Sequence, residues 1–172
     1  MRLVGFRHLG AIAARSARCV PIAIIMIAAL LVGTAAETPS KKPASAAGEG
    51  TEHHVVILID SDDEKIMGHA ISYSMNIARA YRARNEKVKV EIVANGSGIK
   101  LFRADISPLQ QPLAVLRETI PDVVFSMCDS SRQIAEQKEG RPIELIPGAR
   151  LVPFGIGRVV ELQEAGWSYV HG

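Results

Sequence analysis

The chain has 172 residues, with 20 lysines and arginines against 18 aspartates and glutamates, and a formal net charge of +2 at pH 7. Four of the basic residues and none of the acidic ones lie in residues 1–36, so the rest of the chain carries a net charge of −2. The basic balance therefore belongs to the N-terminal segment, and the composition excludes the electrostatic pattern of a nucleic-acid-binding domain.

The N-terminal segment has the three parts of a secretory signal peptide. An arginine-bearing stretch without acids is followed by the apolar run VPIAIIMIAALLVG (20–33) and by the small residues Thr34 and Ala36. This order predicts a signal peptide over residues 1–36. The protein is then expected to be periplasmic or otherwise exported, with a mature chain that starts near Glu37. The alternative is an uncleaved inner-membrane anchor, although the run is short for a span of about 20 residues.

A flexible linker is predicted between this segment and the domain. Residues 37–52, ETPSKKPASAAGEGTE, are rich in Pro, Ala, Ser, Gly and charged side chains, which do not form a packed core. Residues 53–172 are then enough for one small domain with one core. Membrane contact is expected only through the N-terminal segment, if it stays uncleaved.

The first half of this domain is predicted to form strand, helix and strand. The run HHVVILID (53–60) is rich in β-branched residues, as is typical of a strand buried on both faces. Asp60–Asp63 supply capping residues for a helix from about Glu64, in which apolar residues recur at helical spacing. KVKVEIVA (87–94) predicts a second strand, and NGSG (95–98) predicts a turn.

The second half continues the alternation. A helical stretch is predicted around Leu101, and a longer helix from about Ser107. Residues 129–140 predict a short helix that ends at a glycine, with Ser130 and Gln133 as its capping box. The remaining predicted elements are strands at 122–127, 149–155 and 167–171, and a helix at 156–166.

Strands that alternate with helices predict an α/β fold, with a mostly parallel sheet of about five strands flanked by helices in a single domain. In a parallel sheet the carboxyl ends of all strands lie at one edge, where ligands bind. Four polar or glycine-bearing segments follow predicted strands and are expected to meet at that edge: Asp60–Asp63, Asn95–Gly98, Cys128–Ser131 and Pro153–Gly157.

These segments do not match phosphate or calcium motifs. The DSDDE stretch that begins at Asp60 lacks the remaining ligands and the glycine of a calcium loop, so helix capping is favoured. NGSG has Leu101 where a dinucleotide-binding loop has its third glycine. FGIGR, which ends at Arg158, is compatible with an anion site at a helix start and equally with a simple glycine-bearing loop.

No metal site and no cofactor are predicted. His53 and His54 are neighbours in a strand and point to opposite faces, and His69 has no partner at ligand spacing. The sequence also has no GxSxG elbow or other recognisable nucleophile–base set.

Cys128 is the one cysteine outside the N-terminal segment, and two interpretations of it stay open. Free cysteines are among the most buried residues, which favours an inert core position. On the other hand, this thiol lies where a strand ends and a helix begins, so backbone donors and the helix dipole favour its thiolate. A thiol without a cysteine partner in an exported chain also suggests reactivity.

Four stretches of the domain form a specific combination: HHVVILIDSDD, VKVEIVANGSGIKLFRAD, VVFSMCDSS and ARLVPFGIGRVVELQEAGWSYV. In that order they resemble the motifs of DsrE/DsrF-like proteins, over residues 53–171. The resemblance implies a compact α/β domain that assembles as a trimer or hexamer. It also implies that sulfur is carried as a persulfide on a single cysteine.

Carried over to this sequence, the resemblance makes Cys128 the sulfur-bearing residue, with sulfur donor and acceptor proteins as partners. The pocket residues expected around it are Asp60, Asn95, Gly96, Gly98, Ser130, Gly155 and Arg158. The apolar surface for subunit contact is expected on Val159, Val160 and Leu162 or on the final strand.

One departure from the family concerns the residue after the cysteine. Relatives often have Cys-Gly-Asn-Thr, whereas this chain has Cys128-Asp129-Ser130-Ser131. A carboxylate beside a thiol opposes thiolate formation and works against the backbone donors and helix dipole that favour it. We therefore expect an accessible thiol whose pKa is only modestly lowered. The predicted function is an exported persulfide carrier or sulfur-relay component, at most a sulfurtransferase-like carrier. The alternative is a non-catalytic small-ligand-binding protein or an oligomeric subunit of a periplasmic assembly.

Overall fold

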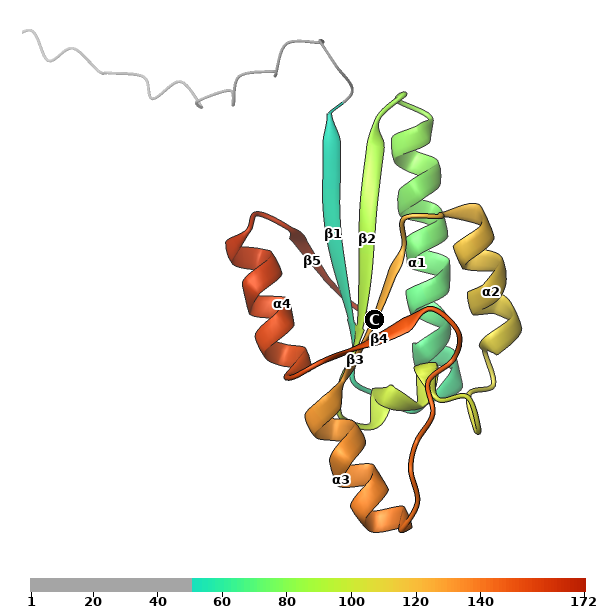
Figure 1. Ribbon diagram of the computed structural model, residues 1–172. Helices are drawn as coiled ribbons and strands as arrows, with labels where there is room; N and C mark the ends of the chain where they lie inside the picture. The colour runs from blue at the N-terminus through green and yellow to red at the C-terminus, as the bar shows by residue number, and fades with distance from the viewer. Residues whose placement is uncertain (1–50) are drawn as a thin grey trace, which may run out of the picture. The chain divides into compact units, whose positions relative to one another are not determined.

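The computed structural model describes residues 51–172, so the predicted signal peptide and nearly all of the predicted linker lie outside the described residues. In the described part, the strands are β1 (Glu52–Ile59), β2 (Lys87–Ala94), β3 (Val124–Cys128), β4 (Ala149–Val152) and β5 (Ser168–His171). The helices there are α1 (Glu64–Arg82), the 3-10 helix η1 (Gly96–Phe102), α2 (Gln110–Thr119), α3 (Asp129–Glu139) and α4 (Gly155–Glu164) (Figure 1). None of these helices is long and apolar enough to cross a membrane.

The five strands of residues 51–172 form one sheet in the order β4-β3-β2-β1-β5, and every neighbouring pair is parallel. The predicted α/β fold is therefore confirmed. β1 and β2 pair over their whole length, from Glu52 beside Lys87 to Ile59 beside Ala94. The apolar run of β1 is explained by its position, because Val55–Ile59 are buried between the helix layers on the two faces.

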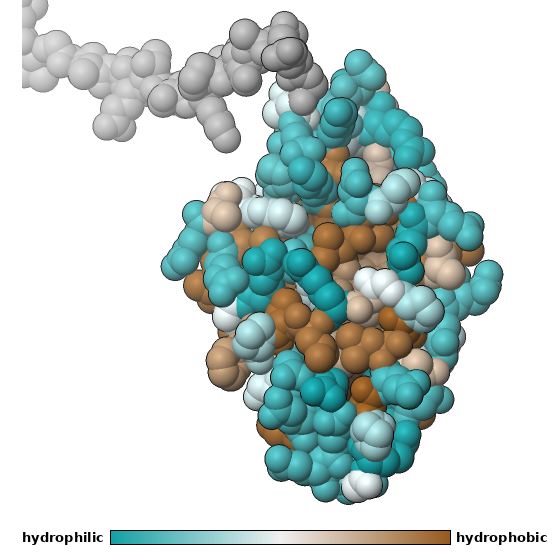
Figure 2. Space-filling model, in the orientation of Figure 1, coloured by the Kyte–Doolittle hydropathy of each residue, from teal (hydrophilic) through white to brown (hydrophobic). Residues whose placement is uncertain are grey.

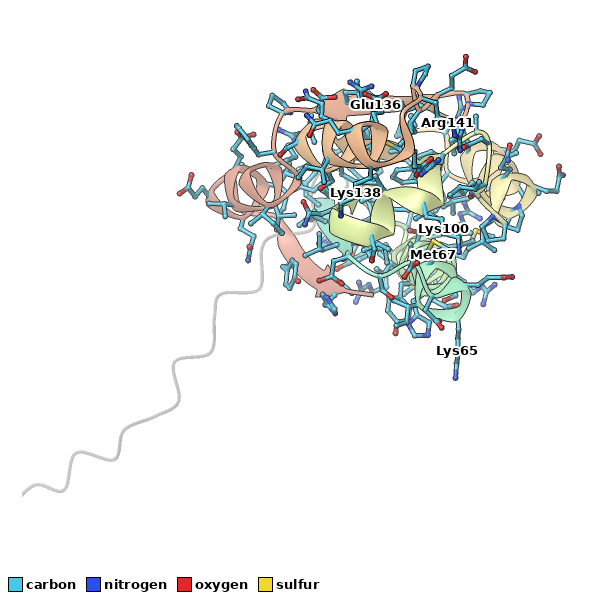
Figure 3. The ribbon with its side chains drawn as sticks, turned by 90° about the horizontal axis from the view of Figure 1, so that it is seen from below. Lys65, Met67, Lys100, Glu136, Lys138 and Arg141 are labelled. Atoms are coloured by element: carbon cyan, nitrogen blue, oxygen red, sulfur yellow. The ribbon has the colours of Figure 1, made fainter. Side chains whose placement is uncertain are left out.

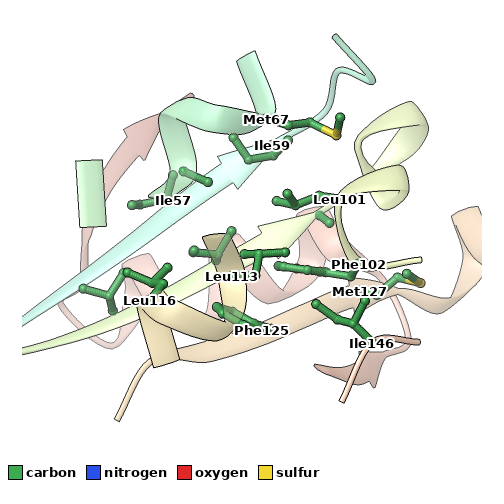
Figure 4. Close-up of a cluster of buried hydrophobic side chains, with 14 of the residues drawn as sticks. Ile57, Ile59, Met67, Leu101, Phe102, Leu113, Leu116, Phe125, Met127 and Ile146 are labelled. Atoms are coloured by element: carbon green, nitrogen blue, oxygen red, sulfur yellow. The ribbon is translucent and has the colours of Figure 1, made fainter. Parts of the chain in front are cut away.

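The two faces of the sheet are covered unequally. On one face, α1, α2 and η1 pack over the larger core, which includes Ile57, Phe102 and Phe125 (Figure 4). On the other face α4 packs alone, through Val159 and Leu162, against side chains of β1 and β2. These two residues were expected to offer subunit surface, and that expectation is wrong because they are only 4% and 3% exposed.

The connection after β4 differs from those before it. β1, β2 and β3 follow one another across the sheet, and α1, α2 and α3 pack with the larger core or with η1. After β4 the chain passes over the opposite face as α4 and adds β5 at the far edge, beside β1 (Figure 1). The ends of β3 and β4 are thus the point where connections leave toward opposite faces, the usual place for a binding site in such a sheet.

The helix starts test the predicted caps. The side chain of Asp63 accepts a hydrogen bond from the N–H of Ile66 at 3.0 Å, which confirms capping at the start of α1. The capping box predicted in α3 is wrong, because that helix already begins at Asp129 and Ser130 lies inside its first turn. Gln133 instead donates to the Asp129 carboxylate at 2.7 Å.

Two boundaries differ from the prediction by three residues. α2 begins at Gln110 and not near Ser107, whose hydroxyl is held by the carbonyl of Leu101 at 2.7 Å in the preceding loop. β4 ends at Val152, three residues earlier than expected, because Gly155 already belongs to α4. This shorter strand brings the first turn of α4 to the carboxyl end of β3.

Candidate functional site

The four segments that follow β1 to β4 meet at the carboxyl edge of the sheet, as predicted. The N–H of Gly96 donates to Oγ of Ser131 at 3.0 Å, which joins the second segment to the third. The hydroxyl of Ser97 donates to the carbonyl of Asp60 at 3.0 Å. The N–H of Ser130 donates to the carbonyl of Pro153 at 3.3 Å, which joins the third segment to the fourth.

Cys128 lies at the centre of this arrangement, as the last residue of β3 and the residue at the N-cap position of α3. Burial alone would raise the pKa of its thiol. The hydroxyl of Ser131 and the backbone N–H groups of Gly155, Ser131 and Ser130 more than offset this effect, and the pKa of the thiol lies below the ordinary cysteine value. Polar groups from two different helices therefore favour the thiolate.

The expectation of an accessible thiol is wrong, because Cys128 is only 3% exposed. The first turn of α4 closes over it at Gly155. A Cβ atom added to that glycine would lie 3.0 Å from Cβ of Cys128 and 3.0 Å from Oδ1 of Asn95. Because Gly155 has no side chain, the first turn of α4 packs closely against Cys128 and contributes to the burial of the thiol.

Two glycines let η1 approach the end of β1. Gly96 has φ of 55°, a conformation that glycine adopts without strain. Gly98 lies against the carbonyl of Ile59, so that any side chain there would overlap the backbone of β1. These contacts place the start of η1 beside Ser131. Of the predicted pocket residues, Gly155 lies against both Cys128 and Asn95, and Gly96 is joined to this group through Ser131, whereas Gly98 packs on the end of β1.

The carboxylate of Asp129 turns away from the thiol. It accepts hydrogen bonds from Nε of Arg132 at 2.8 Å and from the Gln133 amide at 2.7 Å. The hydrogen bond from Arg132 lowers the pKa of Asp129, and the guanidinium compensates its charge. The opposition to a Cys128 thiolate that the sequence suggested is therefore largely removed.

Two predicted pocket residues point elsewhere. The half-exposed carboxylate of Asp60 faces His171, at 3.4 Å, and only its backbone carbonyl takes part in the contacts around the thiol. Arg158 donates to both carboxylate oxygens of Glu91, each at 2.9 Å, on the face of the sheet that α4 covers. Its guanidinium is thus committed to an internal ion pair and not to an anion at the helix start.

That ion pair belongs to a buried polar cluster that the sequence did not reveal. Glu91 is 1% exposed, and it also receives the Ser126 hydroxyl at 2.7 Å and Arg150 at 3.2 Å. Burial alone would raise the pKa of Glu91, but hydrogen bonds from Arg158 and Ser126 more than offset it, and the pKa lies below the ordinary value. The one sign of this cluster in the sequence was Glu91 itself, a charged residue close to the apolar end of the predicted strand 87–94.

An exposed apolar surface adjoins the thiol segment. Figure 2 shows hydrophobic side chains gathered in the middle of one face, over β4 and the start of α4. Among them Phe154 is 68% exposed, Ile156 49% and Leu151 43%. A shallow hollow of about 280 Å³ lies beside them, between β4 and α4.

His53 and His54 point to opposite faces of the sheet, as predicted. His53 stacks on Tyr81 of α1, and His54 stacks on Trp167 on the opposite side of the sheet. Within residues 51–172, no three His, Cys, Asp or Glu side chains lie close enough together to hold a metal ion.

Comparison with known proteins supports the fold. A solved structure, the protein of unknown function MTH1491 from Methanobacterium thermoautotrophicum, superposes with a TM-score of 0.59 and 29% sequence identity. The match covers 70% of this chain and 99% of that one. No family model and no curated protein matches the sequence. These comparisons name no function.

Proposed function

We propose that this chain is an exported DsrE/DsrF-like sulfur carrier that holds a persulfide on Cys128. The observation that carries the proposal is the position of Cys128 at the start of α3 and against Gly155 of α4, where the surrounding polar groups lower the pKa of its thiol. Sulfur carriers need a thiol that is partly ionised near neutral pH, because the thiolate is the nucleophile. The lowered pKa of Cys128 increases the thiolate fraction at neutral pH and so favours this role.

The transfer step balances without an added oxidant. The Cys128 thiolate attacks the outer sulfur of a donor persulfide, R–S–SH, and the sulfur–sulfur bond of the donor breaks. The donor leaves as R–S⁻ with the electron pair of that bond, and Cys128–S–SH keeps the proton. Delivery to an acceptor thiolate is the same step in reverse, and Cys128 then becomes the leaving thiolate that the donors stabilise.

Access to the buried thiol requires a local opening. The segment from Pro153 to Gly155 covers the sulfur, and it follows a strand of only four residues at the edge of the sheet. Elements with few neighbours open at low free energy. We propose that a donor or acceptor protein contacts the apolar surface around Phe154 and displaces this segment. Assembly into a trimer or hexamer is part of the same proposal.

The test is sulfur loading of the purified full chain with Cys19 changed to Ser, so that Cys128 is its one thiol. After incubation with polysulfide, intact mass is expected to rise by one sulfur atom, and peptide mapping is expected to assign that atom to Cys128. Cys128→Ser should not load and should keep its far-UV circular dichroism. Ser131→Ala should load less at neutral pH and recover at higher pH, because the thiol loses a donor. Wild-type protein that folds but never loads would favour the non-catalytic alternative.

A further inference from the structure

A second hollow, of about 480 Å³, lies between η1 and α3. Its volume is in the range of pockets that hold small molecules. Ser131 forms part of its wall and is also one of the residues that lower the pKa of Cys128. The hollow is otherwise a feature separate from the packing around the thiol.

Part of the lining is apolar and uncovered. Ile106 is 44% exposed and Ile134 is 51% exposed, and both face the hollow together with Ala135. Large apolar side chains that remain exposed inside a concave surface are a feature of binding sites more than of ordinary protein surface. This part of the hollow favours the hydrocarbon portion of a ligand.

Two lysines flank the apolar part. Lys138 of α3 makes no ion pair or side-chain hydrogen bond with any of residues 51–172, and Lys100 of η1 donates only to the backbone carbonyl of Asp62, at 3.2 Å. Figure 3 shows both lysines on the side of the molecule seen from below. Both ammonium groups retain donors for an anion.

The other charges around the hollow are compensated internally. The Arg103 side chain, 5% exposed, pairs with Asp105 at 2.7 Å and with Glu139, and Arg141 pairs with the same two carboxylates. These two cations and two anions cancel. Asp62 is the remaining acid of the lining, so Lys100 and Lys138 leave the hollow with a net positive charge.

We propose that this hollow binds a small amphipathic anion. The anionic head group lies between Lys100 and Lys138, and the apolar body packs on Ile106 and Ile134. The proposal is independent of sulfur transfer, because none of these four residues contributes a donor to the Cys128 sulfur.

Titration calorimetry on the full chain tests the proposed binding with three small molecules that differ in head-group charge or in the length of the apolar tail. Hexanoate, which has both an anionic head and an apolar tail, is expected to bind saturably with one site per chain. Acetate lacks the tail and is expected to bind more weakly, whereas hexylammonium carries the opposite charge and is expected not to bind. The three results together separate the contributions of charge and apolar contact.

Variants locate the site. Lys138→Gln and Lys100→Gln are each expected to weaken hexanoate binding about fivefold, because each removes one ion-pair contact with the carboxylate in a partly exposed site. Lys65→Gln is the matched control, since this lysine is exposed on α1 and lies outside the hollow (Figure 3). Ile134→Ser should also weaken binding, whereas Cys128→Ser should bind as the wild type does.

Three outcomes would each overturn the proposal: no saturable binding of hexanoate, equal binding of hexylammonium, or equal affinities of the Lys138→Gln and Lys65→Gln variants. Failure of polysulfide to load Cys128 while hexanoate still binds would reject only the sulfur-carrier proposal. The two proposals are therefore tested separately.

Discussion

In the Glu91 cluster, we expect substitution of the carboxylate and substitution of an arginine to lower the stability of the fold by different amounts. Glu91 is 1% exposed, whereas the side chains of Arg158 and Arg150 are 28% and 52% exposed. If Glu91 is changed to Gln, both arginines can turn toward water. If Arg158 is changed to Gln, the carboxylate stays buried and loses the two hydrogen bonds of 2.9 Å that hold it.

The magnitudes follow from this asymmetry. Arg158→Gln leaves an undercompensated buried charge and is expected to lower the free energy of unfolding by about 3 kcal/mol at pH 7. Glu91→Gln removes hydrogen bonds but leaves no buried charge, and about 1–2 kcal/mol is expected. The double variant with Arg158→Gln and Glu91→Gln should be more stable than Arg158→Gln alone, because Glu91→Gln removes the buried negative charge that Arg158→Gln leaves without its partner.

The pH dependence has a definite sign. In the wild type, the pKa of Glu91 lies below its ordinary value, so its stabilising effect is present above that value and is lost as the pH falls through the lower folded-state pKa. In Arg158→Gln, only Ser126 and Arg150 remain to offset burial, and the pKa of Glu91 is expected to rise above the ordinary value. The variant should then recover stability relative to the wild type as the pH falls from 7 to 5.

Urea denaturation followed by circular dichroism at both pH values measures these differences. Arg158→Lys is the control that keeps the charge and loses the two-pronged contact, and it should fall between wild type and Arg158→Gln. The reasoning fails if Glu91→Gln is the more damaging single change. It also fails if the gap between Arg158→Gln and wild type is the same at pH 7 and pH 5.

Three further predictions concern the thiol segment and the N-terminus. Gly155→Ala should destabilise the fold by about 1–3 kcal/mol, because its Cβ crowds Cys128. Gly157→Ala, where the nearest atom is an ordinary 3.4 Å away, should be neutral or stabilising by up to about 1 kcal/mol; equal urea midpoints for the two would contradict this. Asp129→Asn should leave the pH midpoint of Cys128 alkylation nearly unchanged, whereas a clear fall in that midpoint would show that its carboxylate acts on the thiol. Intact mass of exported protein should correspond to a start near Glu37, and full-length protein confined to the membrane fraction would favour the anchor.

The strands were predictable because their signals are local. The bounds of β2 were predicted to the residue, since Val88, Val90 and Ile92 alternate with charged side chains and a turn follows the strand. The strand order was not predictable in the same way. The position of β5 beside β1 depends on α4 crossing the opposite face, and that is decided by packing between segments distant in sequence.

At the site, the place of Cys128 was predictable and its surroundings were not. A strand followed directly by a helix puts the thiol at the sheet edge, but its burial depends on Gly155, which the sequence places in another element. The partner of Arg158 is Glu91, 67 positions away, and no local pattern joins them. Arg132 at the third position after Asp129 was a usable signal, because residues three apart meet on a helix.

The burial and the activation of the thiol come from the same contact, and this has a consequence for reactivity. The backbone N–H of Gly155 helps to lower the pKa of Cys128, and the same residue packs against Cys128. An opening that admits a sulfur donor therefore removes one group that favours the thiolate, and in the open state only Ser130 and Ser131 of α3 remain to favour it. The two helices then have separable effects on loading. Ser131→Ala should move the pH midpoint of polysulfide loading upward, whereas Gly155→Ala should change the loading rate and leave that midpoint in place. A shift of equal size in both variants would mean that the segment stays closed during transfer, and the opening step would have to be abandoned.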